Sequence, residues 1–102
     1  MKNLFENYLK NGLSEYDSKY LPTYKYVMLL SKNNIITAHF ANIDYIYFIE
    51  YPTSEKEYNT PLEVLKSEIS LTESDAGIIY ENINGQFQTI AFISLKEKNH
   101  KI

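Results

Sequence analysis

Few side chains in this sequence could carry acid–base, nucleophilic or metal chemistry. The chain has two histidines, His39 and His100, and no cysteine. Disulfides and thiolate metal sites are therefore excluded, and a zinc site would lack the three or four ligands it needs. His39 falls in a predicted strand, and local spacing places no Ser or acidic residue near it to orient it as a general base. We interpret it as structural or surface-exposed, and we expect no catalytic residue, no metal site and no cofactor.

Carboxylates are more numerous but form no recognisable site. Five glutamates cluster between positions 50 and 68, namely Glu50, Glu55, Glu57, Glu63 and Glu68. Two of them could face each other as an acid/base pair, but nothing in the sequence sets their separation. A solvated acidic rim is the preferred interpretation. The sequence also contains no glycine-rich phosphate-binding motif. Gly85 is an isolated glycine that is explained by a turn. We therefore predict that the chain is not an enzyme.

Tyrosine is the residue whose abundance suggests a function, with ten copies in 102 residues. Its large apolar ring and polar tip make it common in protein–protein interfaces. Ten rings exceed what a small core can hide, so several should remain on the surface. The predicted partner-binding residues are Tyr45, Tyr47, Tyr51 and Tyr58, together with Glu50, Glu55 and Glu57. The simpler alternative is that Tyr45 and Tyr47 pack under a helix or form a half-exposed sheet face.

The elements that must position these residues can be located by periodicity and turn signals. Apolar residues at helical spacing predict a helix over residues 2–11, ended by Gly12. Ser14 can cap a short helical turn over 15–20. Strands are predicted over 24–32 and 35–41 around an Asn33–Asn34 turn, and a third strand over 43–51, which would place Tyr45, Tyr47 and Tyr51 on one face.

The second half contains one helix and one hairpin. Thr60, Pro61 and Glu63 form a helix start, followed by a helix over 61–70. Asn84–Gly85 predicts a hairpin between strands 77–83 and 86–96, with Ile83 opposite Gln86, Tyr80 opposite Thr89 and Ile79 opposite Ile90. The second arm is apolar on both faces, which predicts a central strand.

This order predicts one compact α+β domain spanning residues 1–102. We expect an antiparallel sheet of about five strands (two hairpins plus one strand), with an N-terminal helix and one capped helix packed on a face. No apolar run is long enough for a membrane span, and the N-terminus does not resemble a signal peptide. The expected location is the cytoplasm, with no membrane partner.

Charge and composition narrow the partner classes. The net charge is −3, and all ten basic residues are lysine. Without arginine the chain has no guanidinium group that could donate two parallel hydrogen bonds to phosphate or guanine. Nucleic acid is therefore disfavoured as a partner. The abundance of Lys, Asn, Ile and Tyr is typical of AT-rich coding sequences, and so of a low-GC bacterium or its phages and mobile elements.

These observations predict a non-catalytic protein-binding module. We expect a small inhibitor or antagonist, of anti-defence or immunity type, that acts by steric occlusion through a tyrosine-rich surface. Its partner would be another protein, and a basic nucleic-acid enzyme is a natural candidate. The main alternative is a nucleic-acid-binding accessory protein with an aromatic platform on a sheet face. A small-molecule binder and a homodimer through an exposed strand such as Tyr45–Tyr51 stay open.

Overall fold

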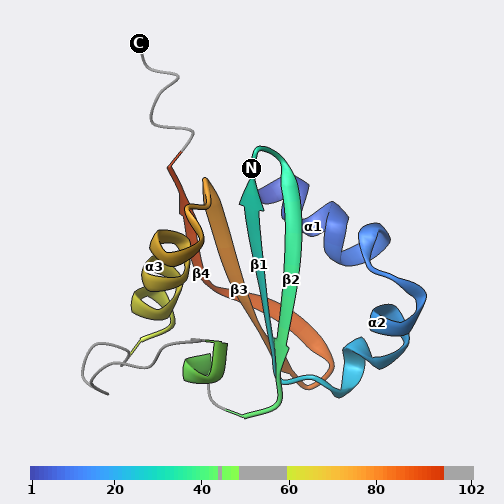
Figure 1. The fold of residues 1–102 in the computed structure, drawn as a ribbon. Helices are drawn as coiled ribbons and strands as arrows, with labels where there is room; N and C mark the ends of the chain where they lie inside the picture. Colours follow the sequence, from blue (N-terminus) through green and yellow to red (C-terminus); the bar gives the residue numbers. More distant parts are fainter. Residues whose placement is uncertain (44, 49–59, 96–102) are drawn as a thin grey trace.

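The computed structural model describes residues 1–43, 45–48 and 60–95. They form an α+β structure around an antiparallel sheet of four strands in the order β2-β1-β3-β4 (Figure 1). The strands are β1 (Tyr26–Lys32), β2 (Ile35–Ala41), β3 (Ala76–Ile83) and β4 (Gln86–Ser94). The predicted fold class is confirmed. The predicted count of about five strands is not matched, since the described residues contribute four.

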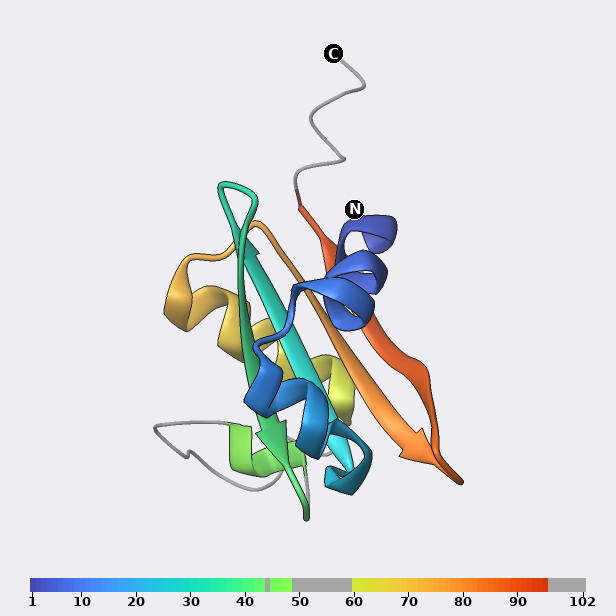
Figure 2. The ribbon, with the colours of Figure 1, turned by 90° about the vertical axis from the view of Figure 1, so that its right-hand side faces the viewer.

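Helices cover both faces of this sheet. One face carries α1 (Lys2–Asn7), its π-helical continuation η1 (Tyr8–Gly12), α2 (Glu15–Tyr20) and the 3₁₀ turn η2 (Leu21–Thr23). The opposite face carries α3 (Pro61–Thr72) and the 3₁₀ helix η3 (Tyr45–Phe48) (Figures 1 and 2). The sequence predicts the helices on one face only. Both faces need cover because β1 is apolar on both.

Two hydrophobic clusters lie on either side of β1. Its residues Val27, Met28 and Leu29 are fully buried, and they alternate between the two clusters. The cluster under α3 consists of Met28, Leu30, Val64, Leu65, Ile69, Ile79 and Ala91. The cluster under α1 consists of Phe5, Val27, Leu29, Ala76, Ile78 and Tyr80. Burying one such large apolar side chain stabilises the fold by roughly 1.5–3 kcal/mol.

Both predicted hairpin turns are confirmed. Asn33 and Asn34 have φ of 53° and 66°, and Asn84 and Gly85 have φ of 55° and 90°. Positive φ at both turn positions is what a type I′ hairpin requires, and Asn and Gly tolerate it. β1 and β2 pair with Met28 opposite His39, and the second hairpin pairs Ile83 with Gln86.

One predicted pair in the second hairpin is wrong. Tyr80 does face Thr89, but Ile79 faces Ala91 in place of Ile90. The register shifts at this point, so Ile90 is the extra residue of a β-bulge in β4. A bulge has no fixed residue signature, and turn geometry alone cannot locate it.

The predicted helix caps are also present. The Ser14 hydroxyl accepts the Asp17 backbone N–H at 3.1 Å, and the Thr60 hydroxyl accepts the Glu63 N–H at 3.2 Å. α3 extends to Thr72, two residues beyond the prediction. It ends at Glu73, whose left-handed conformation (φ 55°) lets the Ser74 N–H reach the Ile69 carbonyl at 3.0 Å.

The predicted strand over 43–51 is wrong where the structure describes it. Tyr45–Phe48 is a 3₁₀ helix, and residues 44 and 49–51 lie outside the described residues. The chain turns here because the rings of Tyr45 and Phe48 both pack against other residues. Tyr45 meets Tyr26 edge-on, with ring centroids 5.8 Å apart, and Phe48 packs against the cluster under α3. Aromatic strand propensity is weaker than such packing.

The apolar second arm of the last hairpin is an edge strand and not the predicted central one. β4 pairs only with β3 in the described sheet. Its two apolar faces are explained by helices: Ile90, Ala91 and Ile93 belong to the α3 side, and Phe87 and Phe92 to the α1 side. Apolar residues on both faces show that both faces are covered, and not that both edges are paired.

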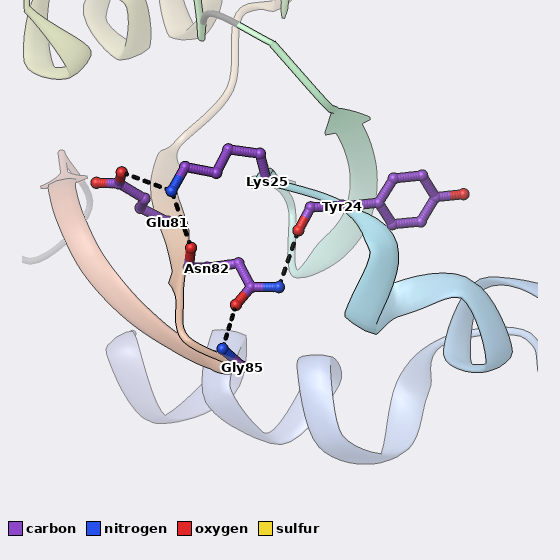
Figure 3. A network of polar contacts seen from close by, with 5 residues as sticks. All are labelled: Tyr24, Lys25, Glu81, Asn82 and Gly85. Carbon is purple, nitrogen blue, oxygen red and sulfur yellow. Dashed lines mark hydrogen bonds and ion pairs between the residues drawn. The ribbon is translucent and has the colours of Figure 1, made fainter.

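Asn82 ties the second hairpin to the segment that enters β1 (Figure 3). Its amide donates to the Tyr24 carbonyl at 3.1 Å, and its side-chain oxygen accepts the Gly85 N–H at 2.8 Å. The same amide also donates to the Pro22 carbonyl at 3.2 Å. Lys25 reaches the Asn82 carbonyl at 3.1 Å and the Glu81 carboxylate at 3.2 Å. One amide therefore positions both the Asn84–Gly85 turn and the start of the central strand.

We expect Asn82→Asp to destabilise the protein by about 1–3 kcal/mol. The carboxylate can still accept from Gly85, but it would place negative charge against the Pro22 and Tyr24 carbonyls in place of two donated hydrogen bonds. Urea unfolding measures the change. Gln86→Glu is the matched control, since Gln86 is exposed and undergoes the same change of charge. Equal midpoints for the two variants would contradict this role.

Candidate protein-binding edge

The structure describes two of the seven predicted partner-binding residues, Tyr45 and Tyr47. Tyr45 is half-buried against Tyr26 and the core, whereas Tyr47 is 68% exposed. The other predicted residues, Tyr51, Tyr58, Glu50, Glu55 and Glu57, lie outside the described residues. The two tyrosines therefore differ: Tyr45 has a packing role, and Tyr47 is free to contact another molecule.

Other tyrosines also reach the surface, as the count of rings predicts. Tyr16 and Tyr20 on α2 are 66% and 38% exposed, and their ring centroids are 4.7 Å apart. Tyr80 is the opposite case. Burial, with a smaller contribution from the negative charge of Glu6, raises the pKa of Tyr80 to about 12. Among the described residues, the exposed tyrosine rings lie on α2 and η3 and do not form the strand-face array that the sequence predicts.

The strongest binding feature is the free edge of β2. β2 pairs with β1 on one side, and no described strand lies on its other side. Because a two-residue turn closes on Lys32 and Ile35, the hydrogen-bonded pairs with β1 are those of Ile35, Thr37 and His39. The backbone N–H and C=O groups of Ile36, Ala38 and Phe40 consequently point away from the sheet.

This edge lacks the features by which sheets avoid pairing with other chains. The sequence IITAHFA has no charged residue and no proline, and β2 pairs with β1 without a register shift. Edge strands are normally protected by lysine, proline, bulges or short length. The other edge, β4, does carry a bulge, at Ile90. Within the part of the chain that the structure describes, β2 is thus an unprotected seven-residue template for another strand.

Both ends of β2 are held in place. At its start, the Asp75 carboxylate accepts the Asn33 N–H at 2.7 Å, which anchors the turn to the beginning of β3. Near its end, the Phe40 ring stacks on Tyr24, with centroids 4.6 Å apart and planes 21° from parallel. Since the strand is already ordered, a partner would bind without the entropic cost of ordering it.

A groove of about 470 Å³ runs beside this edge, on the α3 side of the sheet. Its floor is formed by β1 and β2 and its wall by the end of α3; the lining residues include Leu30, Ile35, Thr37, His39, Thr72 and Ser74. The wall hydroxyls of Thr72 and Ser74 are 2.6 Å apart and bond each other. Ile35 is 71% exposed on the floor. The groove therefore offers mainly apolar surface to side chains from a strand paired with β2.

Two ionisable side chains lie on the groove floor, His39 of β2 and Lys32 of β1, and the Lys32 ammonium pairs with the Glu73 carboxylate at 3.9 Å. The His39 side chain is open to solvent on one side, and burial of the remainder against its neighbours lowers the pKa of His39 below the usual 6.5. The imidazole is therefore neutral at pH 7 and adds no charge to the edge. Among the described residues, no group of three His, Asp or Glu side chains could hold a metal ion.

The sequence predicts the bounds of β2 but does not mark this strand as a binding element. The available signal was a run of seven uncharged residues in a chain that is 23% charged. That run becomes informative only once β2 is known to be an edge. For the described part of the chain, no helix is long and apolar enough to cross a membrane.

Comparison with known proteins returned no match: no family model, no curated protein and no solved structure is similar to this chain.

The edge geometry predicts an alternating pattern of amide hydrogen exchange along β2. Thr37 and His39 donate to β1, so their amides should exchange at least about tenfold more slowly than those of Ile36, Ala38 and Phe40 in dilute protein. Exchange followed by two-dimensional NMR measures this. Uniform protection along the strand would mean that something already covers the edge.

The lowered pKa of His39 predicts that the protein loses stability as the pH falls. Folding disfavours the protonated imidazole, so the unfolded chain binds the proton more tightly. The His39 contribution to the free energy of unfolding should be constant above about pH 6.5, should decrease as the pH drops below that value, and should level off below the folded-state pKa. Comparing wild type with His39→Gln by urea unfolding isolates this contribution. If wild type and His39→Gln show the same pH dependence of the free energy of unfolding, that dependence comes from groups other than His39.

Proposed function

We propose that this chain is a non-catalytic protein-binding module that accepts an extended segment of a partner protein along the free edge of β2. The observation that carries the proposal is the uncharged, unbulged edge of Ile35–Ala41 beside an apolar groove. Strand addition of this kind obtains affinity from backbone hydrogen bonds and specificity from the pockets that receive alternate side chains. Ile36, Ala38 and Phe40 supply the backbone groups, and the groove supplies the pocket.

The consequence for the partner is steric occlusion. A segment held on β2 is no longer available to its own protein, which makes this chain an inhibitor or antagonist of that protein. Tyr47 strengthens the contact because η3 packs beside β2 and exposes this ring to solvent. The net charge of −3 gives weak steering toward a basic partner, such as a nucleic-acid enzyme. An anti-defence or immunity role in a phage or mobile element fits this activity.

The test uses displayed random peptides as the probe. Peptides selected on the wild-type protein should bind with Kd in the micromolar range, about 1–100 μM, and should protect the amides of Ile36, Ala38 and Phe40 from exchange. Ala38→Pro should weaken their binding at least about tenfold, because it removes an outward donor while the bonds of β2 to β1 stay intact.

Ala38→Ser is the matched control, since it keeps the backbone N–H and should bind as the wild type does. A second variant, Thr37→Lys, places a charge on the groove side of the edge without changing the backbone and should also weaken binding. Peptides that bind wild type and Ala38→Pro equally, or that protect amides elsewhere in the chain, would refute strand addition at β2.

A further inference from the structure

The residues of β2 are self-complementary when the strand is turned antiparallel against a second copy of itself. The strand has an odd number of residues, seven, and Ala38 lies at its centre. A two-fold axis at Ala38 pairs Ala38 with Ala38 of the other copy and overlaps the full length of both strands. Since the outward-facing groups belong to Ile36, Ala38 and Phe40, this register forms three narrow pairs with two hydrogen bonds each.

The side chains agree with this register on the α1 side. Ile36 of one copy lies opposite Phe40 of the other, a pairing of a β-branched with an aromatic residue that stabilises antiparallel strands. The small Ala38 side chains meet at the axis. Ile36, Ala38 and Phe40 are each half-buried against the cluster under α1, so the pairing would join the two clusters across the interface.

The groove side is compatible as well. Thr37 lies opposite His39 of the other copy, and both side chains are uncharged at pH 7. No residue of β2 carries a formal charge, so no like-charge contact opposes the two-fold arrangement. Lysines at such positions are the usual means of preventing self-pairing, and β2 has none.

We propose that, without another partner, the strand accepted by β2 is β2 of a second copy, giving a two-fold dimer with one continuous sheet across both protomers. This inference rests on the proposed function, because both use the same edge. A single strand pair buries less than the ~1,200 Å² of a standard stable interface, so the dimer should be weak, with Kd of roughly 10–300 μM. A foreign segment would then bind by displacing the second copy.

The first experiment measures the dimer over a range of concentration. Sedimentation of the wild-type protein from about 5 μM to about 1 mM should show a monomer–dimer equilibrium. Over the same range the amides of Ile36, Ala38 and Phe40 should gain protection while those of Thr37 and His39 stay protected throughout. Ala38→Pro should raise the dimer Kd at least about tenfold, whereas Ala38→Ser, which keeps the backbone N–H and a small side chain, should raise it much less.

The second experiment tests the register with variants that do not alter the backbone. Thr37→Lys and His39→Asp should each weaken the homodimer, because two like charges then lie near the axis. Mixing the two variants should restore association as heterodimers, since the introduced lysine faces the introduced aspartate of the other chain. Native mass spectrometry of the mixture, with one variant isotope-labelled, counts heterodimers against homodimers.

The outcomes separate this inference from the proposed function. A protein that stays monomeric throughout, but binds selected peptides at β2, would overturn the dimer and leave strand addition standing. A dimer unaffected by Ala38→Pro, or a mixture without heterodimers, would place self-association on another surface or in another register and also overturn it. Absence of both self-association and peptide binding would remove the proposed function too.

Discussion

The structure depends on the burial of β1 on both faces. Val27, Met28 and Leu29 are consecutive, and each is fully buried, so the sheet must be covered on two sides. A chain of 102 residues can meet this requirement with one helical layer on each side of a small sheet. α1 and its continuation cover one face, and α3 covers the other (Figure 2). The helical layers on the two faces follow from this constraint.

The two edge strands of the sheet differ in regularity and in how far their faces are covered. β3 lies beside β1, so β2 and β4 are left at the margins. β4 carries a bulge and packs under α3 on one face and toward α1 on the other, where Lys2 lies over the Phe92 ring. β2 is covered mainly on its α1 face, whereas Ile35, Thr37 and His39 stay open beside the groove. A regular, uncharged strand in that position is a feature that soluble proteins usually avoid unless they use it.

Binding a partner strand and binding a second copy are two uses of the same unpaired backbone groups. They differ in what the side chains contribute. A foreign segment can place apolar side chains over the groove, whereas the two-fold register uses the Ile36–Phe40 contact on the α1 side. The two modes would compete. Without a partner segment, the protein would pair with a second copy, and each copy would cover the β2 edge of the other. A partner segment would then replace the second copy on β2, and the edge would not lead to aggregation.

Local signals in the sequence determined the hairpin turns, the helix caps and the approximate limits of most elements. Asn33–Asn34, Asn84–Gly85, Ser14 and Thr60 act through backbone conformation and hydrogen bonds within a few residues, so neighbours in sequence suffice to identify them. Tertiary contacts decided three features that these local signals do not predict. The conformation of Tyr45–Phe48 depends on Tyr26 and the cluster under α3, and the shift at Ile90 depends on the register of two strands. The edge position of β2 depends on the order of all four strands, because hydrophobicity reports burial of a face and carries no information about which strand lies alongside.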